Sequence, residues 1–329
     1  MQDRYGREID YLRISITDRC NLRCRYCMPE DIESFKMSEI LTFEEIISIV
    51  TEAAKLGIKK IKITGGEPLV RRGACDLIRM IKRIPGIEQV TLTTNGVLLK
   101  DNLAEIKDAG IDGINISIDT PDRERYRSLT GRDELDRVLE GLWAALQSGI
   151  KIKINSVCPD IDGSQDLSDV FSMIGFAKDN PVDVRFIEMM PIGFGKDFRA
   201  IGHDILIPAI RERYPDMTKD NESHGNGPAV YYRIPGYKGS VGFISAIHGV
   251  FCQSCNRVRL TTLGYMKSCL CFETGVDLKS IIRSGLSEED KKKALRAGIE
   301  EAILCKPAQH SFDNLKRISE KHVMAAIGG

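Results

Sequence analysis

The chain has 329 residues, with 47 Lys and Arg against 47 Asp and Glu, so its formal net charge is zero. A protein that binds DNA or an acidic membrane surface usually carries a basic excess, and this balance argues against both. No apolar run approaches the roughly 18 residues of a membrane span, and the charged N-terminus is unlike a signal segment. We expect a soluble, cytoplasmic protein with no nucleic-acid or membrane partner.

The first half of the chain alternates between strand-like and helix-like segments. Short apolar, often β-branched runs predict strands at Tyr11–Thr17, Lys60–Thr64, Gln89–Thr94, Gly113–Ile118, Lys151–Val157 and Asp183–Glu188. Stretches of helical period lie between them, at Phe43–Leu56, Cys75–Ile84, Asp101–Ala109, Leu135–Ser148 and Asp166–Ala177. This alternation predicts a parallel sheet covered by helices. Six units are fewer than the eight of a closed barrel, so we expect an α/β fold built as a partial, open (β/α)6 TIM-like barrel.

The alternation ends after Pro191. Val230–Ile234 and Ser240–Ile244 are typical of antiparallel strands joined through a Pro-Gly turn. Ser287–Leu304 has the pattern of a charged amphipathic helix. We therefore divide the chain into a barrel domain, residues 1–225, and a smaller α+β C-terminal domain, residues 226–329.

The chain has 10 cysteines. In a reducing compartment, such thiols are more often metal ligands or catalytic groups than disulfides. Cys20, Cys24 and Cys27 form C-x3-C-x2-C directly after the first predicted strand, which suits a soft metal. Three cysteines that hold a [4Fe–4S] cluster leave one iron open to a small molecule. From the residues alone, a zinc knuckle completed by a distant Cys or His is the alternative.

A second group near the other end of the chain, Cys252, Cys255 and Cys269, forms C-x2-C-x13-C. Cys271 is the nearest candidate for a fourth ligand, and with it the pattern also fits a zinc ribbon. The spacing alone does not decide between a zinc site and an iron–sulfur cluster.

Several cations lie within or beside the predicted strands, in segments that are otherwise apolar: Arg13, Lys62, Lys153 and Arg185. A charge in a parallel strand is costly unless it is paired or faces a ligand. Arg257 and Arg259 alternate beside the second cysteine group, so they point to one side of an extended segment. Cations in this arrangement would suit a triphosphate. The alternative is that they flank the strands and reach solvent.

The first cysteine group and the run Thr64-Gly65-Gly66-Glu67-Pro68 after the second strand together resemble the radical S-adenosylmethionine (SAM) superfamily. The resemblance implies a [4Fe–4S] cluster on Cys20, Cys24 and Cys27, with SAM bound at its open iron. Glu67 would be the anionic partner of the methionine ammonium. The SAM contacts that the resemblance implies are Tyr26, Gly65, Gly66, Glu67, Asn115, Ser117 and Met190.

Further motifs resemble the GTP 3′,8-cyclase family of molybdenum cofactor biosynthesis from end to end: Leu12–Asn21, Cys27–Pro29, Arg185–Pro191, Cys255–Thr261 and Ile327–Gly329. This resemblance implies a second [4Fe–4S] cluster on Cys252, Cys255 and Cys269, which binds guanine. The implied GTP contacts are Arg13, Lys62, Thr93, Lys153, Arg257 and Arg259. Arg185 would lie close to the reacting atoms. The tail, Gly328 and Gly329, would enter the barrel and complete the catalytic site.

The chain departs from this family at two positions. Lys62 stands where the family often has arginine, which leaves its contact with GTP open because lysine lacks the forked donor geometry. Cys271 stands where the family usually has an aromatic residue, and we expect it to be no ligand.

The expected activity is that of a radical SAM lyase that converts GTP to (8S)-3′,8-cyclo-7,8-dihydroguanosine 5′-triphosphate. The expected partners are a flavodoxin- or ferredoxin-like reductant and the cyclic pyranopterin monophosphate synthase that follows in the pathway, and a homodimer is compatible with the resemblance. The alternatives are a radical SAM peptide maturase with an auxiliary cluster and a non-catalytic two-cluster electron-transfer protein. A zinc-binding nucleic-acid module is disfavoured by the zero net charge.

Overall fold

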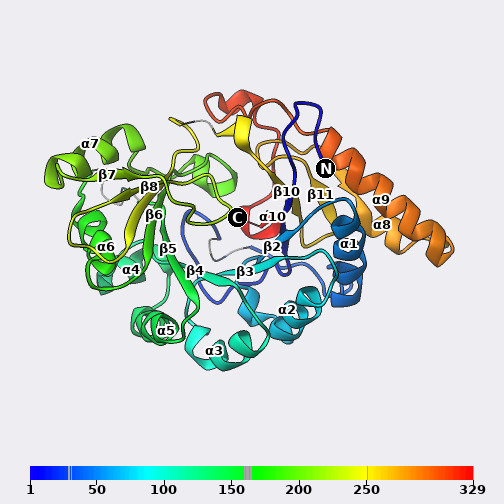
Figure 1. The fold of residues 1–329 in the computed structure, drawn as a ribbon, viewed down its shortest axis with the longest axis horizontal. Helices are drawn as coiled ribbons and strands as arrows, with labels where there is room; N and C mark the ends of the chain where they lie inside the picture. The colour runs from blue at the N-terminus through cyan, green and yellow to red at the C-terminus, as the bar shows by residue number, and fades with distance from the viewer. Residues whose placement is uncertain are drawn as a thin grey trace.

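The computed structural model describes residues 1–28, 30, 32–158, 160, 163, 165–249 and 251–328. Its centre is a 12-stranded sheet with the order β12-β11-β10-β1-β2-β3-β4-β5-β6-β9-β8-β7. The sheet curves around a central space, with helices on its outside (Figure 1). The strands are β1 (Tyr11–Ser15), β2 (Lys60–Thr64), β3 (Gln89–Thr94), β4 (Gly113–Ser117), β5 (Lys151–Ser156), β6 (Asp183–Ile187), β7 (Thr218–Asp220), β8 (Val230–Arg233), β9 (Ser240–Ile244), β10 (Arg257–Leu260), β11 (Tyr265–Lys267) and β12 (Gly275–Asp277).

The α-helices are α1 (Phe43–Lys55), α2 (Ala74–Lys82), α3 (Leu99–Asp108), α4 (Arg123–Thr130), α5 (Leu135–Gln147), α6 (Ser168–Asp179), α7 (His203–Arg213), α8 (Leu278–Ile282), α9 (Glu288–Leu304) and α10 (Met324–Ile327). Short 3₁₀ turns follow β2 at Pro68–Val70 and β6 at Gly193–Lys196, and two more lie at Cys252–Ser254 and Leu315–Arg317.

Strands β1 to β6 pair in chain order and in parallel, as the alternation predicts. Two C-terminal strands continue the parallel sheet, with β9 beside β6 and β10 beside β1. Antiparallel strands complete the two edges, β11 and β12 on one and β8 and β7 on the other. The predicted partial barrel is therefore confirmed. The segment after residue 225 adds strands to both edges of the same sheet, and a separate domain from that residue onward stays a prediction.

Four of the described α-helices were not predicted from the sequence: α4, α7 and the short helices α8 and α10. Helix α4 is mostly polar, so it lacks a strong apolar period, and it is instead delimited by its ends. The Asp122 side chain accepts a hydrogen bond from Arg125 N at 2.8 Å, and Gly131 ends the helix in the left-handed conformation. Helix α7 contains Pro208, a residue that usually argues against a helix interior.

The two faces of the barrel strands differ sharply. Ile14, Ile63 and Ile114 are fully buried in the hydrophobic core beneath the helices. Because successive side chains of a strand point to opposite faces, the neighbours Arg13 and Lys62 point to the inside of the barrel. The C-terminal helix α10 also lies there, as the position of the C-terminus in Figure 1 shows. The fold thus surrounds a polar interior with an apolar layer.

Candidate active site

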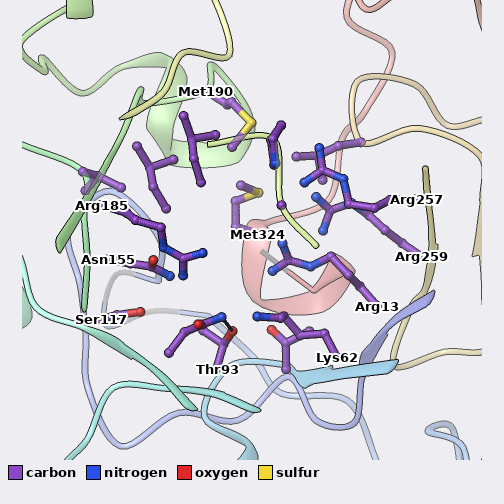
Figure 2. A pocket seen from close by; sticks show the side chains of 18 of the residues that line it. Arg13, Lys62, Thr93, Ser117, Asn155, Arg185, Met190, Arg257, Arg259 and Met324 are labelled. Carbon is purple, nitrogen blue, oxygen red and sulfur yellow. Dashed lines mark hydrogen bonds between the residues drawn. The ribbon is translucent and has the colours of Figure 1, made fainter. Parts of the chain in front are cut away.

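The inward-facing polar side chains form rows because the strand register aligns them. Arg13 of β1 lies opposite Lys62 of β2 and opposite Arg259 of β10. Asn155 of β5 lies opposite Arg185 of β6. Figure 2 shows these side chains turned toward a common space, from opposite sides of the barrel.

This space is a cavity of about 530 Å³. Both predicted groups of cysteines line it, although they come from opposite ends of the sequence. The predicted site residues in its lining are Arg13, Cys20, Cys24, Tyr26, Cys27, Lys62, Gly65, Gly66, Thr93, Asn115, Ser117, Lys153, Arg185, Met190, Cys252, Cys255, Arg257, Arg259 and Cys269. The structure therefore brings together almost all of the predicted site. Glu67 and Gly328 are described residues that lie outside this lining.

The first cysteine group follows β1. Cys20 Sγ accepts hydrogen bonds from Leu22 N at 3.4 Å and from Asn95 Nδ2 at 3.6 Å. Burial raises the pKa of the Cys24 thiol well above its usual value, and the neighbouring Cys27 and Cys20 thiols add to this effect. Thiols that oppose one another's ionisation need a bound cation to ionise together. This donor set suits the iron of a cluster.

Gly65 and Gly66 hold the loop after β2 against the cysteine loop. A Cβ atom built on Gly65 would clash with the carbonyl oxygen of Thr17, and one on Gly66 with that of Arg19. The close approach allows Gly66 N to donate to Thr17 O at 2.7 Å. These glycines are therefore needed for the contact between the two loops.

Glu67 was predicted to meet the SAM ammonium, but the structure places it beneath the loop. The side chain is fully buried. Its carboxylate accepts hydrogen bonds from Leu69 N at 3.0 Å, Thr94 Oγ1 at 2.8 Å and Asn95 N at 2.6 Å. Burial raises its pKa to about 7, against the effect of these donors. The carboxylate thus fixes the loop to the end of β3, and its direct contact with SAM stays a prediction.

Tyr26 lies between the cysteines and the end of β4. Its hydroxyl donates to Asp119 Oδ2 at 2.6 Å, and Asp119 Oδ1 accepts from Val157 N at 2.9 Å. Burial raises the pKa of Tyr26 well above its usual value, and the Asp119 carboxylate adds to the rise. The phenol is therefore a neutral donor whose position depends on Asp119.

The other predicted SAM contacts lie on neighbouring strands or just beyond them. Asn115 Nδ2 donates weakly to Thr93 Oγ1 at 3.4 Å, and both residues line the cavity. Ser117 ends β4, and Met190 follows β6 (Figure 2). All three residues line the same cavity, and Ser117 and Met190 lie at or just beyond the carboxyl ends of their strands, where ligands bind in barrels of this type.

The second cysteine group lies beside β10 and β11. Cys252 Sγ accepts from His310 N at 3.3 Å, and Cys255 Sγ accepts from Lys306 Nζ at 3.7 Å. Burial acts to raise the pKa of Cys255, but the charges of Arg257 and Lys306 outweigh it and lower the value to about 7. This group offers a thiolate in a cationic setting.

Cys271 differs from these cysteines in its surroundings. It is fully buried in an apolar cluster with Ile192, Leu270 and Phe312, and it is absent from the cavity lining. Its Sγ accepts from Ser311 N at 3.4 Å. These contacts support the interpretation that Cys271 is a core residue.

Burial and mutual repulsion disfavour the charged forms of the cations in the cavity wall. Burial lowers the pKa of Lys62 well below its usual value, and the charges of Arg185 and Arg13 lower it further. Burial likewise lowers the pKa of Arg13 to about 10, with Arg257 and Arg185 adding to the effect. The pKa of Arg259 is also lowered by burial and by Arg13. Cations that destabilise one another in this way favour an anionic ligand between them.

Arg185 Nε and Asn155 Oδ1 belong to the cavity wall, and both atoms are buried without a hydrogen-bond partner in the described part of the chain. Both groups point into the central space in Figure 2. Gly242, opposite Arg185 in the register, leaves room for its side chain. A substrate with both donors and acceptors would satisfy these atoms.

Lys153 has partners within the protein. Its Nζ donates to Asp183 Oδ2 at 2.6 Å, to Tyr231 Oη at 3.0 Å and to the carbonyl oxygen of His224. The side chain lines the cavity, but its charge is already paired with Asp183. Its contact with GTP stays a prediction.

The C-terminal tail enters the barrel. Ala325 O accepts from Ser15 Oγ at 3.2 Å, and Gly328 O accepts from Arg259 Nη1. Gly328 is buried with φ +74°, and a Cβ atom there would lie 3.2 Å from Thr64 Cγ2. The predicted catalytic partner Gly329 lies outside the described residues. Arg259, predicted to bind GTP, thus also holds the end of the tail.

Sequence reasoning missed several residues of this site. Asn95 contacts both Cys20 and the Glu67 carboxylate, Asp119 orients Tyr26, and Asn155 faces Arg185. The signal for Asn155 was its place two residues after Lys153, which puts both side chains on the same face of β5. The roles of Asp119 and Lys306 depend on partners distant in sequence.

Within the described ranges, no group of three or more His, Cys, Asp or Glu side chains is arranged to hold a single metal ion. Each helix in those ranges is too short or too polar to cross a membrane.

The chain is similar to known proteins over its full length. The model of the Radical SAM superfamily matches residues 14–174, and that of Molybdenum Cofactor Synthesis C matches residues 182–312. A protein of Clostridium perfringens strain 13 named GTP 3′,8-cyclase is 43% identical over 330 residues, which covers 100% of both chains. One of the same name from Pelotomaculum thermopropionicum is 41% identical over 334 residues, again over 100% of both chains.

Among solved structures, that of SuiB from Streptococcus suis bound to S-adenosylmethionine superposes with a TM-score of 0.62 at 13% identity. It covers 96% of this chain and 76% of that chain, and at this identity it shows a likeness of fold. Identity above 40% over the full length carries more: the chain belongs to the GTP 3′,8-cyclase family of radical SAM proteins.

Proposed function

We propose that this chain converts GTP to (8S)-3′,8-cyclo-7,8-dihydroguanosine 5′-triphosphate, the first step of molybdenum cofactor biosynthesis. The main support for the proposal is that two cysteine groups and a row of buried cations line the same cavity. The full-length relatives named GTP 3′,8-cyclase support the same reading.

Cys20, Cys24 and Cys27 would hold a [4Fe–4S] cluster, beside which Gly65, Gly66, Tyr26, Asn115, Ser117 and Met190 would contact SAM. When bound, this pair supplies a 5′-deoxyadenosyl radical that removes a hydrogen atom from the substrate ribose. The task of the protein is to hold the ribose within reach, and a displacement of about 1 Å costs roughly a hundredfold in rate.

Arg13, Lys62, Arg257 and Arg259 would bind the triphosphate. The positive charges of these side chains repel one another, and a bound polyanion would relieve this repulsion. Thr93 and Lys153 would add neutral and charged donors. Arg185, whose Nε is buried without a partner in the described chain, would orient the ribose or base near the reacting atoms.

Cys252, Cys255 and Cys269 would hold a second [4Fe–4S] cluster at the end of the cavity that receives the guanine. Lys306 and the backbone at His310 already donate to two of these thiols. Donors of this kind fit a negatively charged iron–sulfur cluster. The cationic cavity wall favours a nucleotide over a peptide as the substrate.

The proposal includes a reductant of the flavodoxin or ferredoxin type, since the reaction begins with a one-electron reduction. The cyclic product would pass to the cyclic pyranopterin monophosphate synthase. We also propose that the protein acts in the cytoplasm, and a homodimer is compatible with this assignment.

The test is an anaerobic incubation of the iron-loaded protein with GTP, SAM and dithionite, followed by mass analysis of the products. We expect 5′-deoxyadenosine together with a cyclised product isomeric with GTP. A Cys20→Ala variant should form neither, because it lacks the first cluster. SAM cleavage without any change in GTP, in protein that carries both clusters, would overturn the proposal.

A further inference from the structure

Lys306 is buried at the second cysteine group, and no role in that group was predicted for it. It follows the C-terminal end of α9 and is only 4% exposed. Its Nζ donates to Arg257 O at 2.7 Å, to Ser268 O at 2.9 Å and to Cys255 Sγ at 3.7 Å. An ammonium group has three donors, and here each has a partner.

The three acceptors belong to the two chain segments that carry the cysteines. Arg257 is two residues after Cys255, and Ser268 directly precedes Cys269. The Ser268 hydroxyl also donates to Ala302 O of α9 at 2.6 Å, which ties the second segment to the same helix. One ammonium group therefore connects two segments that also pair with each other as β10 and β11.

We propose that Lys306 is a positioning residue of the second cysteine group, which fixes the Cys255 and Cys269 segments relative to each other and places a positive charge at the Cys255 sulfur. This inference rests on the proposed second cluster. It goes beyond that assignment because it names the residue that sets the geometry and the electrostatics of the site.

The surroundings of the ammonium group support this role. Arg257 faces the same sulfur, and Arg7 lies nearby, where its Nη1 donates to Cys252 O at 2.9 Å. Arg7 is neutralised by Asp3 at 2.6 Å. Burial lowers the pKa of Lys306, and the Cys255 and Cys269 thiols act against this shift and favour the charged form. Lys306 thus contributes a charge and a hydrogen bond at one particular ligand.

The physical consequence is a change in redox behaviour. Reduction adds negative charge to a cluster, so a nearby cation and a hydrogen bond to a ligand sulfur favour the reduced form. Removing Lys306 should make the second cluster harder to reduce, while the first cluster should keep its potential.

The experiment compares Lys306→Met, Lys306→Gln and wild type as iron-loaded proteins under anaerobic conditions. Redox titration monitored by electron paramagnetic resonance gives the potential of each cluster, and the signal that added SAM perturbs identifies the first one. We expect Lys306→Met to lower the ratio of reduced to oxidised second cluster about tenfold at a fixed potential, which corresponds to about 59 mV for one electron. Lys306→Gln keeps a donor and should shift the potential less.

Lys316→Met is the matched control, since it removes a lysine from an exposed position of the same C-terminal segment. It should leave both potentials unchanged. Loss of about half of the iron in both Lys306 variants, with the control fully loaded, would also support the proposal. Full iron content with an unshifted second potential in Lys306→Met would overturn it, even if that variant were less stable.

This readout is separate from the proposed activity, because the titration uses neither GTP nor product. A wild-type protein with only about four iron atoms would sink the second-cluster assignment itself. If wild type held about eight iron atoms and the Lys306 variants had unaltered potentials, the second cluster would stand and only the role of Lys306 would be disproved.

Discussion

Arg257 and Arg185 line the same cavity, yet their surroundings predict different losses on mutation. Arg257 stacks on Phe251 at 5.0 Å, at the start of β10, which suits a fixed phosphate contact. We expect Arg257→Ala to weaken GTP binding by about 1.5–3 kcal/mol, the value of a charge-assisted hydrogen bond. Arg185→Ala should lower turnover more than affinity, because its Nε points at the reacting region. Anaerobic equilibrium binding and product formation measure the two effects.

Arg72→Ala is the control for this pair, because Arg72 is exposed and outside the cavity lining. Affinity for GTP that is the same in Arg257→Ala as in this control would remove Arg257 from the binding site.

Glu67 predicts a dependence of stability on pH. Burial raises the pKa of Glu67 to about 7 from its ordinary value of 4.5, so the folded chain binds a proton more tightly than the unfolded chain between these values. The stability contributed by this carboxyl group is therefore full below pH 4.5 and falls as the pH rises to about 7. Urea unfolding of iron-free protein should show the decline in wild type and a flatter profile in Glu67→Gln. Parallel profiles for the two proteins would mean that Glu67 is ionised throughout.

At the scale of elements, the contact between the β2 loop and the cysteine loop depends on a glycine. A side chain at position 66 would strike the Arg19 carbonyl, so Gly66→Ala must displace one loop. We expect this variant to lose most of the iron of the first cluster, with a parallel loss of SAM cleavage. Gly175→Ala is the control, since a Cβ atom there has open space within helix α6. Normal iron content in Gly66→Ala would show that the loops can separate without harm.

The tail provides a second test at this scale. Arg259 donates to Gly328 O inside the barrel, so the last residues are held beside the cations that would bind GTP. Deleting residues 328 and 329 removes no thiol and no charged side chain. We expect the truncated protein to keep both clusters and to bind GTP, but to release 5′-deoxyadenosine with almost no cyclic product.

A substitution refines this test. Gly328→Ala places a Cβ atom 3.2 Å from Thr64 Cγ2 and in a backbone region that disfavours alanine, so it should also reduce cyclisation. Gly285→Ala has open space and serves as the control. Full cyclisation by the truncated protein would show that the tail enters the barrel but has no role in the cyclisation.

At the scale of the molecule, the sequence predicts those strands and helices that have a local periodic pattern of apolar residues. The six strands and most outer helices follow from apolar periodicity, and the inward position of Arg13 and Lys62 follows from strand alternation. The parallel pairing of β9 with β6 and of β10 with β1 joins segments far apart in the chain, and no local pattern encodes it. The prediction of a separate C-terminal domain came from local signals: the end of the alternation after Pro191, the hairpin β8–β9 and the helical pattern of Ser287–Leu304.

Within the site, too, contacts between residues far apart in the chain could not be predicted from a local pattern. The cysteine spacings and the glycine pair were visible because their spacing is itself the signal. The partner of Tyr26 is Asp119, 93 positions away, and the partner of Cys255 is Lys306, 51 positions away. The burial of Glu67 beneath its loop was also hidden, because a carboxylate after two glycines predicts a ligand contact as readily as a loop anchor.

The whole molecule is expected to carry two clusters that are removable one at a time. The cysteine groups lie near opposite ends of the chain but line one cavity, so each is a separate ligand set within one barrel. Wild type should hold about eight iron atoms, and both Cys20→Ala and Cys255→Ala about four, because three thiolates hold each cluster. Cys255→Ala should still cleave some SAM but form no cyclic product, whereas Cys20→Ala should do neither.

Cys271→Ser separates the ligand assignment from a general effect of losing a thiol. Cys271 is buried in an apolar cluster with Ile192, Leu270 and Phe312 and is itself absent from the cavity lining, so we expect full iron content and activity. Stability should follow the clusters, because a group that binds only the folded chain stabilises it. Chelation of all the iron should lower the thermal midpoint of wild type and Cys271→Ser equally, and that of Cys255→Ala less. If Cys271→Ser held half the iron and Cys269→Ser held as much as wild type, the third ligand would be Cys271 and not Cys269.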